Sequence, residues 1–122
     1  MSDMKGIITG FFTFAIALST AFGQANSKLA DQYYLDGEYE KAAQLYEGLA
    51  NEANRSDYYF TKYIECLLAL DEYERSEETI RQRIDTNPSN VSLYVTLGNV
   101  LERQNKFEEA DQVFASAIDN LP

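Results

Sequence analysis

Residues 37–42 read GEYEKA, residues 71–76 read DEYERS and residues 105–110 read NKFEEA. Each stretch has an aromatic residue at its third position and a small residue at its sixth, and consecutive stretches lie 34 residues apart. The same interval separates bulky residues outside these stretches: Tyr46, Ile80 and Phe114, and also Leu29, Tyr63 and Leu97. Because apolar residues within each copy recur at helical spacing, the pattern predicts three copies of a helix–turn–helix unit.

A helix–turn–helix unit with this period resembles the tetratricopeptide repeat family. The third copy carries the most complete set of the family's pattern residues: Tyr94, Leu97, Gly98, Ala110, Phe114 and Pro122. The resemblance covers three copies, at about residues 23–56, 57–90 and 91–122, so we predict a repeat domain over 24–122. It implies an all-α fold in which antiparallel helix pairs stack into a short right-handed α-solenoid.

The aromatic residues at repeat positions are interpreted as core. They are Tyr33, Tyr39, Tyr46, Phe60, Tyr63, Tyr73, Tyr94, Phe107 and Phe114. The glutamate pairs Glu77-Glu78 and Glu108-Glu109 stand at equivalent places on second helices, where their neighbours are expected to face solvent. We interpret these pairs as surface charges near helix starts rather than as catalytic carboxylates.

The composition narrows the classes of function. The 122 residues include 20 acids and 10 bases, a net charge of −10, which repels a phosphate backbone and disfavours nucleic acid as a partner. A protein or peptide of basic character suits that charge. The chain has no histidine and one cysteine, Cys66, in an apolar helix. We therefore expect a buried thiol, no cofactor or metal site, and no enzyme activity.

The N-terminal segment has the features of an export signal. Lys5 precedes an apolar run over residues 7–18, and small residues stand at Ala21 and Gly23. This pattern predicts a signal peptide over residues 1–23, cut after Gly23, or after Ala25 as the near alternative, and a periplasmic or secreted protein. The other interpretation is an uncleaved membrane anchor over residues 6–23, which is a run of 18 residues without charge.

The resemblance also implies where a partner binds, because arrays of this family use the concave face lined by the first helix of each pair. Helical spacing assigns nine residues to that face: Lys28, Asp31, Tyr34, Tyr58, Lys62, Glu65, Leu68, Asn99 and Arg103. Such a mixed face suits an amphipathic or extended peptide with basic character, and the competing interpretation is a solvated helix surface. The predicted function is an exported scaffold or adaptor for protein–protein or protein–peptide binding.

The last predicted helix carries an apolar stripe of Phe114, Ile118 and Leu121, which a further helix would normally cover. Two interpretations follow. The chain is the N-terminal sensor or assembly segment of a larger membrane or envelope protein, or it associates with itself through this helix.

Overall fold

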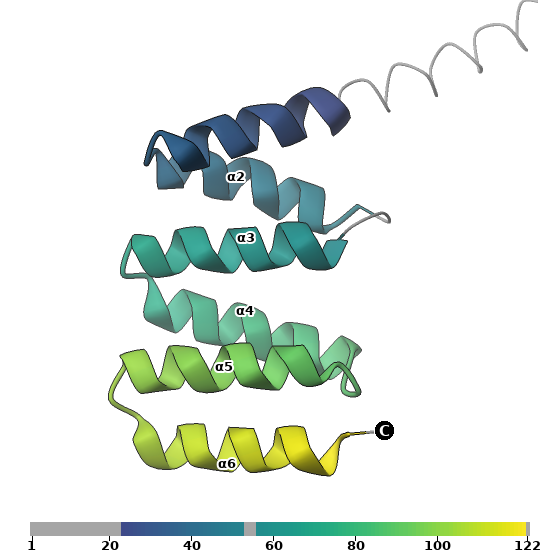
Figure 1. Cartoon of the computed structure of the whole chain (residues 1–122), viewed down its shortest axis with the longest axis vertical. Coiled ribbons are helices and arrows are strands. Elements are labelled where there is room, and N and C mark those ends of the chain that lie inside the picture. The colour runs from purple at the N-terminus through teal and green to yellow at the C-terminus, as the bar shows by residue number, and fades with distance from the viewer. Residues whose placement is uncertain (1–22, 53–55, 122) are drawn as a thin grey trace, which may run out of the picture. The chain divides into compact units, whose positions relative to one another are not determined.

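A computed structural model describes residues 23–52 and 56–121 (Figure 1). Within them lie six helices and no strand: a helix over 23–35, α2 (Tyr39–Ala50), α3 (Ser56–Ala69), α4 (Tyr73–Thr86), α5 (Val91–Arg103) and α6 (Phe107–Asp119). The predicted all-α class is confirmed. The export signal predicted over residues 1–23 and the anchor alternative over 6–23 fall, apart from Gly23, outside the described residues.

The chain forms two compact units, Met1–Tyr63 (unit 1) and Ile64–Pro122 (unit 2). In its described part, unit 1 holds the helix over 23–35, α2 and the beginning of α3. Unit 2 holds the end of α3 together with α4, α5 and α6, and α5 packs against both α4 and α6.

One residue in the left-handed conformation follows the first helix of each predicted pair. These residues are Gly37 with φ 76°, Asp71 with φ 58° and Asn105 with φ 61°. After each, a backbone N–H reaches back five residues over 2.9 Å: Glu38 to the Tyr33 oxygen, Glu72 to Leu67, and Lys106 to Leu101. This Schellman arrangement satisfies the last carbonyl groups of a helix and reverses the chain, as Figure 1 shows for α5 and α6. The predicted turns therefore recur with the 34-residue period.

The core of unit 1 combines small and large side chains. Ala42, which was predicted as a small repeat position, is fully buried, as are Ala30 and Tyr46. Phe60 and Tyr63 add buried rings from α3. Because a methyl side chain takes up little space, these two alanines let helices approach closely, and the larger rings fill the space beside them.

Unit 2 uses the same repeat positions with different residues. Ile80 and Ala110 are fully buried, and Ser76 is fully buried with its hydroxyl donating to the Glu72 carbonyl at 2.9 Å. Gly98 of α5 lies directly against the Phe114 ring of α6, and a Cβ atom at this position would overlap the ring. A side chain at position 98 would therefore force the Phe114 ring to move.

The aromatic core prediction is confirmed in part. Tyr46, Phe60 and Tyr63 are buried, and Tyr33, Tyr39, Tyr73, Tyr94 and Phe114 are half-buried. The prediction is wrong for Phe107, which is 58% exposed. At the equivalent place in unit 1, Tyr39 contacts the Tyr34 ring, but the residue that corresponds to Tyr34 near Phe107 is Glu102. Phe107 therefore lacks that aromatic neighbour.

Candidate functional site

Five tyrosines of unit 1 form a chain of ring contacts, here called the tyrosine cluster: Tyr34, Tyr39, Tyr46, Tyr58 and Tyr59. Tyr34 meets Tyr39 and Tyr46 edge to face, with centroid distances of 5.7 Å and 6.4 Å. Tyr46 stacks on Tyr59 at 6.3 Å, and Tyr59 meets Tyr58 edge to face at 5.3 Å. These separations lie in the range in which aromatic pairs attract one another.

The buried members of the cluster have hydrogen-bond partners for their hydroxyl groups. The Tyr46 hydroxyl donates to Asp31 of the helix over 23–35. The hydroxyl of Tyr59, which is also buried, donates to Ser27 Oγ at 3.0 Å. Because a buried hydroxyl without a partner is costly, these two bonds fix the rings relative to the first helix. The cluster is therefore held rigidly from inside.

The outer part of the cluster is accessible to solvent. Tyr58 is 41% exposed, and Tyr34 and Lys62 are half-buried. The Lys62 ammonium lies 4.4 Å from the centroid of the Tyr34 ring, within the range of a cation–π contact. A second such contact in unit 1 places the Lys41 ammonium 5.3 Å from the Tyr33 ring. Tyr34 and Tyr58, which both lie on first helices of the repeat, thus present their rings at the surface of unit 1.

Four of the nine predicted face residues meet at the tyrosine cluster: Asp31, Tyr34, Tyr58 and Lys62. Lys28 also lies in unit 1 and is exposed. In unit 2, Glu65 and Leu68 of α3 are half-buried, while Asn99 and Arg103 of α5 are exposed. A single binding face that joins all nine residues stays a prediction.

Tyr59 belongs to the cluster but is absent from the predicted set, and its hydroxyl donates to Ser27 of the helix over 23–35. Tyr59 corresponds by the 34-residue interval to Ala25 and Leu93, an apolar position that indicates core. A tyrosine at such a position needs a hydrogen-bond partner for its hydroxyl, but the sequence does not identify Ser27 as that partner.

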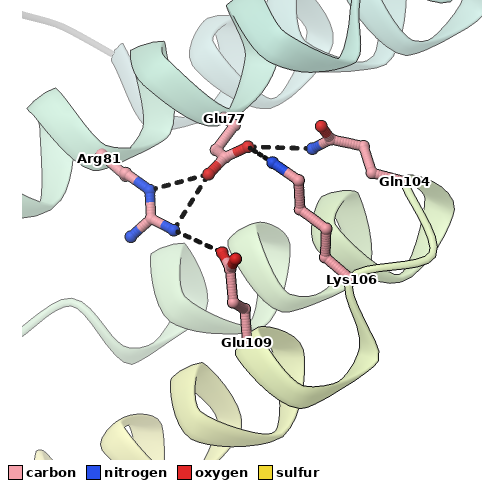
Figure 2. Close-up of polar contacts among 5 residues, drawn as sticks. All are labelled: Glu77, Arg81, Gln104, Lys106 and Glu109. Carbon is pink, nitrogen blue, oxygen red and sulfur yellow. Dashed lines mark hydrogen bonds and ion pairs between the residues drawn. The ribbon is translucent and has the colours of Figure 1, made fainter.

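Unit 2 contains a polar network centred on Glu77 of α4 (Figure 2). Its carboxylate accepts hydrogen bonds from Gln104 Nε2 and Lys106 Nζ, both at 3.1 Å, and from Arg81 Nε and Nη2 at 3.2 Å and 3.1 Å. Arg81 also lies 3.7 Å from the Glu109 carboxylate. The network therefore joins α4 to the turn between α5 and α6.

The position of Glu77 corrects the prediction that both glutamate pairs face solvent. Its side chain is only 15% exposed, whereas Glu78, Glu108 and Glu109 are exposed as predicted. Burial raises the pKa of Glu77, but the hydrogen bonds from Gln104, Lys106 and Arg81 outweigh that effect and hold its pKa below the usual value. The carboxylate is therefore ionised and structural at neutral pH.

A cavity of about 450 Å³ opens beside the start of α4, lined by Asp71, Glu72, Tyr73, Glu74, Arg75 and Gln104. The Tyr73 hydroxyl donates to Asp71 Oδ1 at 2.9 Å, and this hydrogen bond raises the pKa of Tyr73. Half of the lining residues are acidic, and the one basic residue among them, Arg75, pairs with Glu72 at 3.2 Å.

Cys66 is fully buried, as predicted. Across residues 23–52 and 56–121, no group of three or more His, Cys, Asp or Glu side chains is placed to hold a metal ion. None of the helices in this part of the chain is both long and apolar enough to cross a bilayer.

Among solved structures, the fold is similar to that of the Yersinia enterocolitica type III secretion translocator chaperone SycD, with a TM-score of 0.67 and 16% sequence identity. The similarity covers 80% of this chain and 73% of the chaperone chain. No family model and no curated protein matches the sequence. At this level of identity the likeness concerns the fold, and it agrees with an all-α solenoid of helix pairs.

Proposed function

We propose that this chain is an exported scaffold or adaptor of the tetratricopeptide type that binds a protein or peptide through the tyrosine cluster. The observation that carries the proposal is the cluster itself, in which two partly accessible rings stand on a rigid, hydrogen-bonded base. The 34-residue period and the resemblance to a chaperone fold support the repeat class.

A few residues contribute most of the binding energy in a typical protein interface. Tyrosine is enriched among the residues that dominate binding, because it offers a large, rigid surface with a polar tip. Tyr58 is 41% exposed beside the buried Tyr59, so a partner can cover its ring without rearranging the core. The net charge of −10 favours a partner with basic character.

The test is selection of binding peptides from a displayed library of random dodecapeptides. We expect saturable binding by individual synthesised peptides, measured by fluorescence anisotropy. Tyr58→Ala should weaken that binding about tenfold or more, as is usual for a dominant interface residue. Leu29→Ala serves as the control, because Leu29 is 43% exposed in the same unit but makes none of the ring contacts of the cluster.

Circular dichroism should show that both variants keep the helical content and melting temperature of the wild type. Equal peptide affinities for Tyr58→Ala and Leu29→Ala would remove the tyrosine cluster from consideration. A library that yields no saturable binder would argue against a peptide-binding scaffold.

Export is the second element of the proposal, and it rests on the sequence of residues 1–23. The intact mass of the protein in separated soluble and membrane fractions tests it. A soluble species that begins at Gln24 would support a periplasmic or secreted protein. A species that keeps residues 6–23 in the membrane fraction would instead favour the alternative, in which the repeats serve as the sensor or assembly segment of a larger envelope protein.

We also propose that two copies of the chain associate with each other through the last helix, α6. Ile118 is 68% exposed on α6, and Leu121 and Phe107 are also exposed. Sedimentation velocity of the wild type and of Ile118→Glu tests this association. We expect the wild type to form a larger species that the substitution abolishes. A wild type that sediments as a monomer at high concentration would contradict it.

A further inference from the structure

A positively charged side chain, that of Lys62, lies against the face of the Tyr34 ring. The Lys62 ammonium lies 4.4 Å from the ring centroid, well inside the distance of about 6 Å at which a cation is attracted to an aromatic face. Tyr34 comes from the helix over 23–35 and Lys62 from α3, so the contact joins the first helices of two consecutive copies within unit 1. The Tyr34 ring face therefore already holds a positive group at this place in the fold.

The two sides of this contact differ in rigidity. Tyr34 is held edge to face by Tyr39 and Tyr46, and the fully buried Tyr46 is bonded through its hydroxyl to Asp31. Lys62 is a half-buried side chain on a flexible four-carbon stem. The Lys62 side chain can thus adopt another rotamer when a group enters, whereas the ring stays in place and is already oriented for binding.

The charges around the ring favour a cation from a partner. The chain has a net charge of −10, and Asp31 lies one helical turn before Tyr34. A guanidinium group suits an aromatic face better than an ammonium group, because it is planar and more weakly hydrated. An arginine of a bound peptide can therefore compete successfully with Lys62.

We propose that the Tyr34 ring face binds an arginine side chain of the bound peptide. In the free protein Lys62 occupies this binding site, and the arginine displaces it when the peptide binds. This inference rests on the proposed peptide-binding function and names the chemistry that the tyrosine cluster recognises. It has a consequence of definite sign. Removing the charge of Lys62 should tighten the binding of an arginine peptide, even though the partner is expected to contact this face.

The experiment uses one arginine-containing dodecapeptide selected on the wild-type protein, synthesised in two forms. The second form replaces arginine with citrulline, which keeps the shape but has no charge. Fluorescence anisotropy gives the dissociation constant of each form for the wild type, Lys62→Gln and Lys41→Gln. Lys41→Gln is a matched control, because it removes the same charge and the same kind of tyrosine contact at Tyr33, on α2 instead of a first helix.

For the wild type, we expect citrulline to bind about three- to tenfold more weakly than arginine. Lys62→Gln should bind the arginine peptide about two- to fivefold more tightly and leave the affinity for the citrulline peptide unchanged. Lys41→Gln should change neither affinity. Should Lys62→Gln lose helical content, Tyr34→Leu provides the second test, since it should abolish the preference for arginine over citrulline.

The outcomes separate this inference from the proposed function. Three outcomes would overturn the proposal that an arginine binds the Tyr34 ring face. These are equal binding of the two peptides, equal tightening by both lysine substitutions, and selected peptides without basic residues. In each of these cases a loss of binding in Tyr58→Ala would leave the scaffold function standing. Failure of every selected peptide to bind saturably would overturn both.

Discussion

Replacing Glu77 with glutamine should destabilise the protein, although the sequence alone places this residue among surface charges. The substitution keeps the size of the side chain and removes its charge. The Glu77 carboxylate accepts bonds from Gln104, Lys106 and Arg81, and its side chain is 15% exposed. Glutamine can offer only one oxygen, so at least one of the three donors must turn to water.

The magnitude follows from the exposure of those donors. A hydrogen bond to a charged group contributes about 1.5–3 kcal/mol when it is well shielded, and an exposed ion pair about 0.2–1 kcal/mol. Arg81 and Lys106 are 47% and 40% exposed, so each of their bonds should contribute an energy near that of an exposed ion pair. The burial of the Glu77 carboxylate increases this contribution somewhat. We expect a loss of about 1.5 kcal/mol in the free energy of unfolding, summed over the network.

Urea denaturation followed by circular dichroism at 222 nm measures this loss, because urea is uncharged and does not screen the network. With a slope of about 1–3 kcal/mol per M, the midpoint should fall by roughly 0.5–1.5 M. Glu78→Gln is the matched control. It removes the same charge from the neighbouring, exposed position and should change stability by less than about 0.5 kcal/mol.

Salt provides an internal check, since added sodium chloride should narrow the difference between the wild type and Glu77→Gln. The reasoning is refuted if Glu77→Gln and Glu78→Gln unfold at the same urea concentration. A loss that grows in high salt would also refute it, because salt can only weaken the attraction between these charges.

Three further predictions rest on the same denaturation measurement. Since the folded-state pKa of Glu77 lies below its unfolded value, its contribution is fully present above the unfolded pKa. The advantage of the wild type over Glu77→Gln should therefore shrink as the pH falls through the acidic range, and constant differences between pH 7 and 3 would contradict this. Gly98→Ala should cost about 1–3 kcal/mol through overlap with the Phe114 ring, and Phe114→Leu should recover part of that loss in the double variant. Alanine should have opposite effects at two glycines of unit 1. Gly37→Ala should lower stability by about 1 kcal/mol, because the backbone at φ 76° disfavours a residue with a Cβ atom. Gly48→Ala should raise stability by about 0.5–1 kcal/mol, because this position lies within α2 with open space around it and alanine favours the helix.

The repeat interval predicted the fold well because its strongest signals are local. Small residues at Ala42 and Ala110 are fully buried as expected, and the left-handed residues of the turns stand at the same interval. A turn depends on backbone conformation over a few residues, and close helix approach depends on the absence of side-chain bulk. Both requirements can be read from residue type and spacing alone.

The polar network could not be predicted in this way, since it depends on side chains that meet across helices. Lys106 stands directly before Phe107. At the same repeat position the first two copies have the acids Glu38 and Glu72. Those acids precede α2 and α4 and pair with Lys41 and Arg75 in the first turn of the helix that follows each of them. The change of sign at Lys106 makes a bond to Glu77 available, but a periodic pattern does not reveal which distant acid it meets.

The tyrosine cluster was predicted in part, for a related reason. Tyr34, Tyr58 and Lys62 were assigned to a face by helical spacing, and the structure joins them through shared ring contacts. The hydroxyl bonds of Tyr46 and Tyr59 that make the cluster rigid involve partners 15 and 32 residues away. Spacing predicts which residues share a face, whereas these bonds depend on how two helices are rotated against each other.

The repeat interval also separates what the fold requires from what binding requires. A side chain needed for helix packing has a reason to recur in every copy, as the buried Ala42, Ser76 and Ala110 do in kind. The candidate site does not recur. In the third copy Glu102 corresponds to Tyr34, Ser92 corresponds to Tyr58, and Thr96 corresponds to Lys62. Because the same helix–turn–helix unit forms with these polar residues, packing does not demand two tyrosines and a lysine at those positions. Their presence together in unit 1 supports the proposal that this surface binds a partner.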